Sequence, residues 1–549
     1  MFNSYRRYFR LMLVSLPQRQ HGEASPVCLY QDREEGDVDQ GALLIGGVFR
    51  FAQKTYSLPL RGVWQSNSWP VEVRRWFYGF DWLRDLRTFG TNGARLLARS
   101  MVASWADRPP ADPVARESGV MGRRLSNWLG HYEFCLSTAT EGTQQLVLDA
   151  AVKEARRLSA LLPLPPIGWE GLAVLRGLLA VYMAVPHYDG FFKRFEQQLP
   201  LELGRLLGED GIVAERSPEA QYRCVQQLTA IQGMFTTLQW MPPDCVPVML
   251  GRACAVLRAF CHGDGGLALF NGSQERGEKA VLELLEQAER YRVVASSLRK
   301  GGFVRMTAGR SLLLADVAAP APHGMDRLAH AGTMSFEFSH HRQRLFVNCG
   351  AAEGGAWQRA LRSSAAHTVL VVDGESSSDV GADGHVTRRP SQVRCKQRRQ
   401  GRVQEVHMSQ NGYYPSHGVI WHRSLFLEPS GEELRGCDTV EGESDVPFTL
   451  RFHVHPDVRV EREDEEIILH APSEIWRFRQ TGGVIALEDD FYMGRCAPEQ
   501  TSQIIVRACA GRDLPAPTGE EAAGSGSSRA VKPPRRQQRV EWVLEHVPL

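Results

Sequence analysis

The sequence HAGTMSFEFSHHRQRLFVNCG (residues 330–350), followed by AAHTVLVVDG (residues 365–374), decides the fold of this chain. Three short apolar runs within it have the length and composition of β-strands: Thr333–Phe338, Arg344–Asn348 and Thr368–Val372. His330 and His367 stand just before the first and the third run. A strand edge is a rigid mount that could hold two imidazoles toward one point. The alternative is that both are polar residues that cap strands.

Length and composition indicate a globular chain of several domains. Its 549 residues fit two to four domains, and 43% hydrophobic residues can fill sizeable cores. The 64 Lys and Arg against 63 Asp and Glu give a net charge of +1, so we expect no nucleic-acid partner. The eleven cysteines form no CxxC pairs, which argues against a disulfide framework and a structural zinc site.

Helical periodicity dominates residues 65–300. Gln145–Leu162, for example, places Leu148, Val152 and Ala155 on one face. Other helices are predicted at Asn92–Trp105, Met121–Ser137, Trp169–Met183, Gly190–Leu207, Pro218–Leu238, Pro247–Phe260 and Lys279–Tyr291. Such an array closes into a toroid or stacks as a solenoid. Residues 1–64 before it are predicted to be a leader with a short hairpin, Ala42–Phe51 and Lys54–Leu60.

The period changes near Gly301, where an all-β region begins. Further strands are predicted at Val304–Met306, Ser311–Val317, Val403–Ser409, Val419–Leu427, Phe448–His455, Val458–Glu461, Glu466–His470, Ile475–Arg479, Val484–Glu488 and Val540–Val547. Many short strands separated by turn signals predict a large antiparallel β-sandwich over residues 301–549. Pro515–Gln538 is poor in apolar residues and is predicted to be a mobile loop.

These segments resemble the heparinase II/III-like polysaccharide lyases. The resemblance rests on Leu328-x-His330-x-Gly332-x-Met334-Ser335-Phe336-Glu337-Phe338, Val347-Asn348-Cys349-Gly350, Ala366-His367-Thr368, Trp76–Gly90 (WFYGFDWLRDLRTFG) and His262–Gly272 (HGDGGLALFNG). It implies a multidomain α and β protein, with an N-terminal incomplete (α/α) toroid followed by a C-terminal antiparallel β-sandwich. It also implies a lyase that cleaves uronic-acid-containing glycans by β-elimination, with an acidic polysaccharide as partner.

The resemblance places candidate residues on the helical side of the molecule. Asp210–Pro218 is similar to a D-G-G-H-V-x-R-x-P loop, in which Val213 takes the histidine position. Glu215 is a candidate for substrate binding, and Arg216 could hold a substrate carboxylate bidentately as part of catalysis. The alternative for Arg216 is a solvated or structural residue.

The loop that begins at His262 is the strongest candidate for substrate contact. His262 is predicted to be catalytic, and Asp264 and Asn271 to bind substrate, because the flanking glycines allow close backbone approach to a ligand. The same glycines would also suit a helix C-cap followed by a turn.

On the sandwich side, the resemblance assigns His330 a catalytic role and makes His330, His367 and Asn348 candidate metal ligands. Zinc or calcium is possible there, although no cofactor is required, and an amide oxygen is a weak zinc ligand. Leu328 and Gly332 also depart from the family motif. Tyr413 is a candidate catalytic acid, with aromatic packing before a strand as its alternative.

Two further functions compete with cleavage. The replacements at Val213, Leu328, Gly332 and Asn348 suggest a catalytically impaired glycan-binding or cell-envelope polysaccharide biogenesis protein. An interaction scaffold needs only the helical array. The resemblance implies a cell-envelope or periplasmic location, but no clear signal peptide is present, which leaves the cytoplasm open. No stretch approaches the ~18 apolar residues of a transmembrane helix.

Overall fold

A computed structural model describes residues 25–52, 54–59, 62–65, 68–289, 293–401, 403–442, 446–495, 497–508 and 536–548. The chain divides into two compact units. The first comprises residues 1–214, 220–255 and 284–293, and the second comprises residues 215–219, 256–283 and 294–549. The division differs from a single cut at residue 300, because the segment that contains the His262 loop packs with the sandwich.

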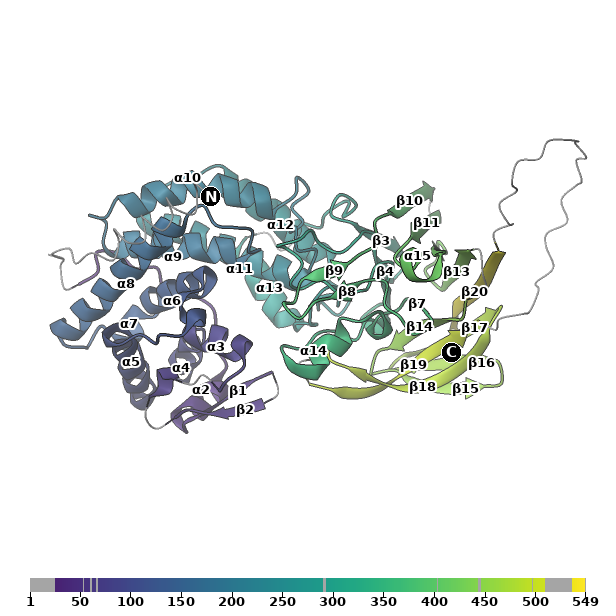
Figure 1. Ribbon diagram of the computed structural model, residues 1–549, viewed down its shortest axis with the longest axis horizontal. Coiled ribbons are helices and arrows are strands. Elements are labelled where there is room, and N and C mark those ends of the chain that lie inside the picture. The colour runs from purple at the N-terminus through teal and green to yellow at the C-terminus, as the bar shows by residue number, and fades with distance from the viewer. Residues whose placement is uncertain are drawn as a thin grey trace, which may run out of the picture. The chain divides into compact units, whose positions relative to one another are not determined.

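Helices make up most of the first unit (Figure 1). Together with the helices that straddle the division, they are α2 (Val38–Ile45), α3 (Val71–Tyr78), α4 (Leu83–Phe89), α5 (Asn92–Asp107), α6 (Ser118–Gly130), α7 (Tyr132–Cys135), α8 (Glu141–Leu161), α9 (Glu170–Ala184), α10 (Gly190–Leu206), α11 (Pro218–Leu238), α12 (Cys245–Ala259) and α13 (Glu278–Gln287).

Two glycines allow α6 and α9 to pack closely. A Cβ on Gly122 would lie 2.6 Å from the Cα of Val174, and a Cβ on Gly177 would lie 2.7 Å from the carbonyl oxygen of Gly122. Both helices are buried over most of their length, so this contact forms the centre of the helical unit.

The predicted N-terminal hairpin is confirmed only in part. Strands β1 (Val48–Phe51) and β2 (Lys54–Ser57) pair antiparallel, but the preceding residues form α2. The Asp37 carboxylate accepts hydrogen bonds from the backbone N–H groups of Asp39 and Gln40 and thereby caps this helix. The cap explains why Ala42–Ile45 is helical although the sequence predicted a strand.

Two eight-stranded antiparallel sheets form the body of the second unit within the described residues. One has the order β18-β19-β14-β6-β5-β4-β3, and β7 also pairs with β14. Its strands are β3 (Phe303–Ala308), β4 (Ser311–Asp316), β5 (Phe336–His340), β6 (Gln343–Val347), β7 (Leu370–Val372), β14 (Phe448–Val454), β18 (Val484–Tyr492) and β19 (Glu499–Arg507).

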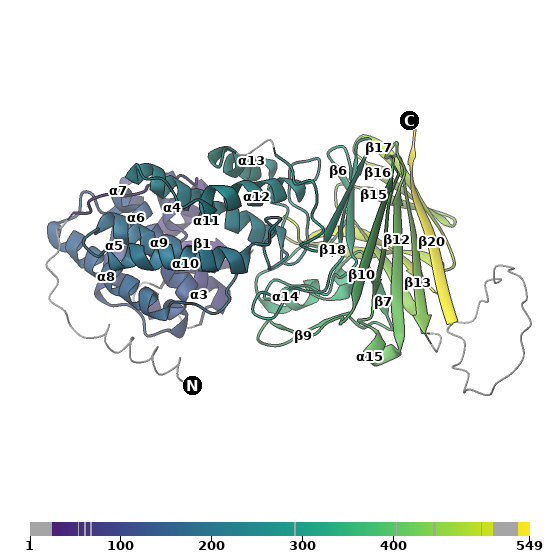
Figure 2. The same ribbon diagram turned by 90° about the horizontal axis from the view of Figure 1, so that it is seen from above.

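The other sheet has the order β10-β11-β12-β13-β20-β17-β16-β15. Its strands are β10 (Val393–Gln400), β11 (Val403–Gln410), β12 (Val419–Leu427), β13 (Glu433–Gly442), β15 (Arg459–Glu463), β16 (Glu466–Ala471), β17 (Glu474–Thr481) and β20 (Arg536–Val547). Figure 2 shows the long strands β12, β13 and β20 side by side. Helix α14 (Gly355–Leu361), helix α15 (Tyr414–His417) and the short pair β8 (Asp379–Val380) and β9 (Val386–Arg388) complete the unit.

Strand β13 is one that the sequence did not predict. Its Gly436 is the cross-strand partner of Trp542 in β20, and a Cβ on this glycine would lie 2.0 Å from the indole ring. The glycine makes room for the tryptophan, so here it marks a packed strand and not a turn.

The loop predicted for Pro515–Gln538 falls mainly outside the described residues. The last three residues of the predicted loop, 536–538, belong to strand β20, which begins at Arg536.

The core between the two sheets is aromatic and contains one fully buried ion pair. Phe336 stacks on Trp542 with ring centroids 5.6 Å apart. In the same core, the Arg423 guanidinium donates to the Asp438 carboxylate at 2.7 Å, and both side chains have no solvent exposure. Arg423 also donates to the carbonyl oxygens of Met334 and Thr368, which come from the opposite layer. This arginine therefore ties the two layers together.

We expect the substitution Arg423→Met to lower the free energy of unfolding by about 3–5 kcal/mol, because Asp438 would be left as an uncompensated buried charge. Arg435→Met in β13 is the matched control, since this arginine is 62% exposed and should change stability by less than about 1 kcal/mol. Denaturant unfolding of both variants measures the difference. Equal losses would contradict the proposed role of Arg423.

Candidate functional site

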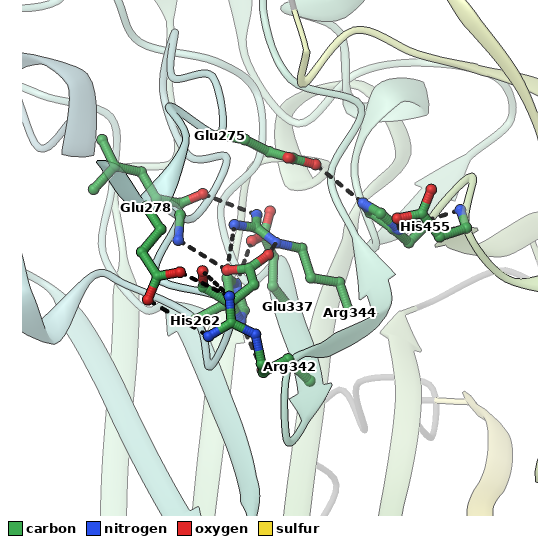
Figure 3. A network of polar contacts seen from close by, with 12 residues as sticks. His262, Glu275, Glu278, Glu337, Arg342, Arg344 and His455 are labelled. Atoms are coloured by element: carbon green, nitrogen blue, oxygen red, sulfur yellow. Dashed lines mark hydrogen bonds and ion pairs between the residues drawn. The ribbon is translucent and has the colours of Figure 1, made fainter. Parts of the chain in front are cut away.

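The Glu337 carboxylate in β5 is the centre of the polar network that contains His262. Both side chains are fully buried, and the Nε2 of His262 lies 2.8 Å from Oε2 of Glu337. The other carboxylate oxygen accepts from the backbone N–H of Leu269 and from both the backbone N–H and the side-chain amide of Asn348, each at 3.0 Å. Glu337 thus joins the His262 loop to β5 and to the end of β6 (Figure 3).

His262 is held as a neutral imidazole. Burial, reinforced by the positive charge of Arg344, lowers the pKa of His262. Because Nε2 faces a carboxylate, it carries the proton, and Nδ1 accepts from the Ser339 hydroxyl at 2.8 Å. Both ring nitrogens are therefore used inside the protein.

Asp264 forms a bidentate ion pair with Arg344 in β6. The guanidinium Nε and Nη2 lie 2.7 Å and 3.1 Å from the carboxylate oxygens, and Arg344 holds the pKa of Asp264 below its usual range in spite of burial. The glycines of this loop do permit close approach, but the approach is to the protein itself. A Cβ on Gly263 would lie 1.6 Å from the carbonyl oxygen of His341.

Asn271 and Arg216 belong to a second buried network. The Asn271 amide donates to the carbonyl oxygen of Arg216 at 2.7 Å and accepts from the backbone N–H of His330 at 3.1 Å. The Arg216 guanidinium pairs with the Asp316 carboxylate and donates to the carbonyl oxygens of Gly301 and Gly302. The structure thus brings Arg216, Asn271 and His330 together through hydrogen bonds to backbone groups.

His330 and His367 contact each other, and the Asn348 side chain is hydrogen-bonded to Glu337 and to the backbone of Thr368. Nδ1 of His367 faces the carbonyl oxygen of Ser363 at 2.8 Å and so carries a proton. His367 Nε2 therefore accepts a hydrogen bond from His330 Nδ1, and these two nitrogens are 3.2 Å apart. The Asn348 oxygen accepts from the backbone N–H of Thr368 at 3.2 Å. Burial lowers the pKa of His330 well below its usual value and that of His367 to about 4.

The remaining predicted residues lie apart from the Glu337 network. Tyr413 is buried in the sandwich core, where its hydroxyl donates to the carbonyl oxygen of Leu370 at 2.7 Å. Glu215 is buried in the second unit. Val213 is buried in the first unit, and its backbone N–H donates to Gln221.

A cluster around Glu275 was missed at the sequence level. His455 Nε2 lies 3.0 Å from the Glu275 carboxylate (Figure 3). The same carboxylate accepts a hydrogen bond from the Tyr492 hydroxyl. Although burial opposes it, the hydrogen bonds from His455 and Tyr492 lower the pKa of Glu275. His455 directly follows β14, and the sequence alone could not indicate which carboxylate would meet it.

A basic strand was also missed. Residues 388–404 contain no acidic residue and seven basic ones: Arg388, Arg389, Arg394, Lys396, Arg398, Arg399 and Arg402. Arg394, Lys396 and Arg398 alternate along β10, are exposed and form no ion pair within the described part of the chain. Strand β10 is at the edge of its sheet. A charge count over a short window would have found this run.

Comparison with known proteins supports the fold. Residues 293–542 match the family described as heparinase II/III-like, C-terminal. FtsZ-localized protein C of Caulobacter vibrioides is 26% identical over 456 residues, which cover 78% of each chain. Within the described part of the chain, every helix is too short or too polar to span a lipid bilayer.

Solved polysaccharide lyases share this architecture. A heparinase III structure is similar with a TM-score of 0.72 at 12% identity, covering 98% of this chain and 90% of that one. The heparan sulfate lyase HepC from Pedobacter heparinus gives 0.56 at 11% identity, covering 99% and 87%. A chondroitinase AC lyase gives 0.51 at 9% identity, covering 98% and 82%. The predicted helical region followed by an antiparallel sandwich is confirmed.

We expect Glu337→Ala to lower the free energy of unfolding by at least about 3 kcal/mol, because His262, Leu269 and Asn348 would lose a buried acceptor. Glu463→Ala, at an exposed position of β15, is the control and should change stability by no more than about 0.5 kcal/mol. Chemical denaturation of both variants tests this expectation. A small effect at Glu337 would show that the network is not needed for stability.

The network should also make stability depend on pH through His262. The unfolded imidazole titrates near pH ~6.5 and the folded one lower, so the unfolded state binds more protons below that pH. The contribution of His262 is therefore complete above pH ~6.5 and declines as the pH falls. We expect wild type to lose more stability than His262→Gln between pH 7 and about 5, as measured by melting temperature. Parallel losses would contradict a neutral buried His262.

Proposed function

Because residues 293–542 match the heparinase II/III-like, C-terminal family, we propose that this chain binds an acidic, uronic-acid-containing polysaccharide and does not cleave it with the four predicted catalytic residues. The observation that carries this proposal is the state of the four predicted catalytic side chains. His262, Arg216, His330 and Tyr413 are all buried and make hydrogen bonds inside the fold.

Cleavage by β-elimination requires three available groups. One neutralises the substrate carboxylate, one removes the neighbouring proton and one protonates the leaving oxygen. Arg216 uses its guanidinium on Asp316 and on backbone carbonyls, so its charge is already paired. His262 has no open nitrogen, and the Tyr413 hydroxyl is bonded within the sandwich core. To act on a substrate, each would first have to break a buried interaction.

The replaced motif positions support the same proposal. Val213, at the histidine position of the Asp210–Pro218 loop, is buried and cannot accept or donate through its side chain. A Cβ on Gly332 would lie 2.7 Å from the His367 ring, so this position is filled by the imidazole. Asn348 supplies two hydrogen-bond donors to Glu337.

The basic strand β10 supplies a surface for an acidic chain. Alternate residues of a strand lie on one face about 6.5–7 Å apart, so Arg394, Lys396 and Arg398 form a row of positive charge. A polyanion can contact several of these groups at once. Charged residues on an edge strand also prevent pairing with other sheets, so binding and aggregation must be measured separately.

Cleavage is the second candidate. It is favoured by the similarity to heparinase III, which extends over 98% of this chain. In that case groups other than the four above would perform the chemistry. The partner under either proposal is an acidic glycan. We place this glycan in the cell envelope, as the resemblance of the sequence to the lyase family implies.

The two candidates give opposite results with heparan sulfate and alginate. We expect binding that weakens as salt rises and no growth of the ultraviolet absorbance that an unsaturated uronic product would produce. Dextran, which is uncharged, is the control ligand. Sustained absorbance growth that scales with protein concentration would overturn the non-cleaving proposal, and no affinity for any acidic glycan would overturn both.

The surface itself is tested by a triple variant, Arg394→Gln with Lys396→Gln and Arg398→Gln. We expect it to lower acidic-glycan affinity roughly tenfold, because exposed ion pairs contribute about 0.2–1 kcal/mol each. Arg459→Gln with Arg462→Gln and Arg477→Gln removes the same charge from β15 and β17 and should retain affinity. Light scattering separates any aggregation from loss of binding. Equal affinities of the two triple variants would contradict the role of β10.

A further inference from the structure

Three potential metal ligands meet at the end of β6. Cys349 follows β6 by two residues, His453 is in β14 and Asp490 is in β18. Backbone contacts fix each position: His453 pairs with Val347 and Gln503, Asp490 pairs with Thr501, and the Cys349 carbonyl accepts from Met493 at 2.8 Å. The three side chains therefore converge on a framework of paired strands.

The ligand atoms lie within contact of one another. Cys349 Sγ is 3.2 Å from His453 Nδ1 and 3.8 Å from Asp490 Oδ2, and that nitrogen and oxygen are 2.6 Å apart. Cys349 and His453 are 3% and 1% exposed, whereas the Asp490 side chain is 14% exposed. Two of the three residues are therefore buried, and the third, Asp490, is partly exposed to solvent.

The hydrogen bond of His453 Nε2 determines which atoms of the cluster present lone pairs to one another. Nε2 lies 3.1 Å from the carbonyl oxygen of His367, which can only accept, so Nε2 carries the proton. In a neutral ring Nδ1 then presents a lone pair to the Asp490 carboxylate. Lone pairs on nitrogen, oxygen and sulfur that face one another require a positive charge between them, either a proton or a cation.

We propose that Cys349, His453 and Asp490 form a zinc site. Sulfur and imidazole nitrogen with one carboxylate suit zinc, whereas calcium requires oxygen ligands. Tetrahedral zinc with ordinary bond lengths separates such ligands by about 3.3–3.6 Å. The two sulfur distances are close to that range, and the Nδ1–Oδ2 distance reaches it if the partly exposed Asp490 side chain moves outward by about 0.7 Å. A water molecule would complete the coordination.

The surroundings of the cluster support this assignment. The hydrogen bond from His453 Nε2 to a backbone carbonyl is the usual arrangement that orients a zinc-bound imidazole. A second group of similar residues, His323, Asp326 and His385, is different. The Asp326 carboxylate there already accepts from the Arg389 guanidinium at 2.9 Å and from the Val386 backbone N–H, so it is neutralised without a metal.

Zinc loading of the untagged full chain tests the proposal. The protein is stripped with a chelator, mixed with zinc and desalted, and its metal content is measured by mass spectrometry. We expect about one zinc per chain in wild type, and background content in Cys349→Ala and in Asp490→Asn. Cys437→Ala in β13 and His385→Gln, in the second group, are the controls and should retain the metal. No retained zinc in wild type, or equal zinc in all four variants, would overturn the proposal.

Wild type alone gives a second test that does not depend on the folding of a variant. Zinc in excess should raise the melting temperature by roughly 5 °C, whereas magnesium should have no effect. Cobalt should bind in place of zinc and give the near-ultraviolet charge-transfer band of a thiolate ligand. Binding without that band would exclude Cys349 as a ligand, and the cluster would then be a protonated His453–Asp490 ion pair.

Discussion

A buried carboxylate, that of Glu337, determines how the second unit is assembled. It has no solvent exposure, so every lone pair that lacks a donor would carry a desolvation cost. Its donors come from the His262 loop and from the end of β6. The loop therefore belongs to the sandwich unit although it follows a helix, and the division of the chain between units reflects this interaction.

The motif that carries the family resemblance is largely structural in this chain. Glu337 accepts, Asn348 donates to it, and Asp264 pairs with Arg344, so these residues stabilise one another. Polar groups satisfied in this way hold their loops in place.

Charge in the sandwich is separated by location. The fully buried pair of Arg423 and Asp438 joins the two layers, whereas exposed basic residues line the edge strand β10. A net charge of +1 for the whole chain conceals this separation. Interaction with an acidic polymer depends on the local row of charge and not on the total.

Local sequence patterns determined much of this fold. The alternation in Val419–Leu427 and the helical spacing in Gln145–Leu162 fixed β12 and α8, because each period selects one type of backbone.

Local patterns failed where a distant residue decided the outcome. Thr333–Ser335 has strand composition but precedes β5 in a turn with Met334 at φ 70°. The β13 segment is polar and contains two glycines, and it forms a strand in which Trp542 fills the space beside Gly436. The same limit applies to the sites. The sequence singled out His262 and His330, but strand register and packing alone decided that Glu337 and His367 would be their partners and that Cys349, His453 and Asp490, separated by 104 and 37 residues, would meet.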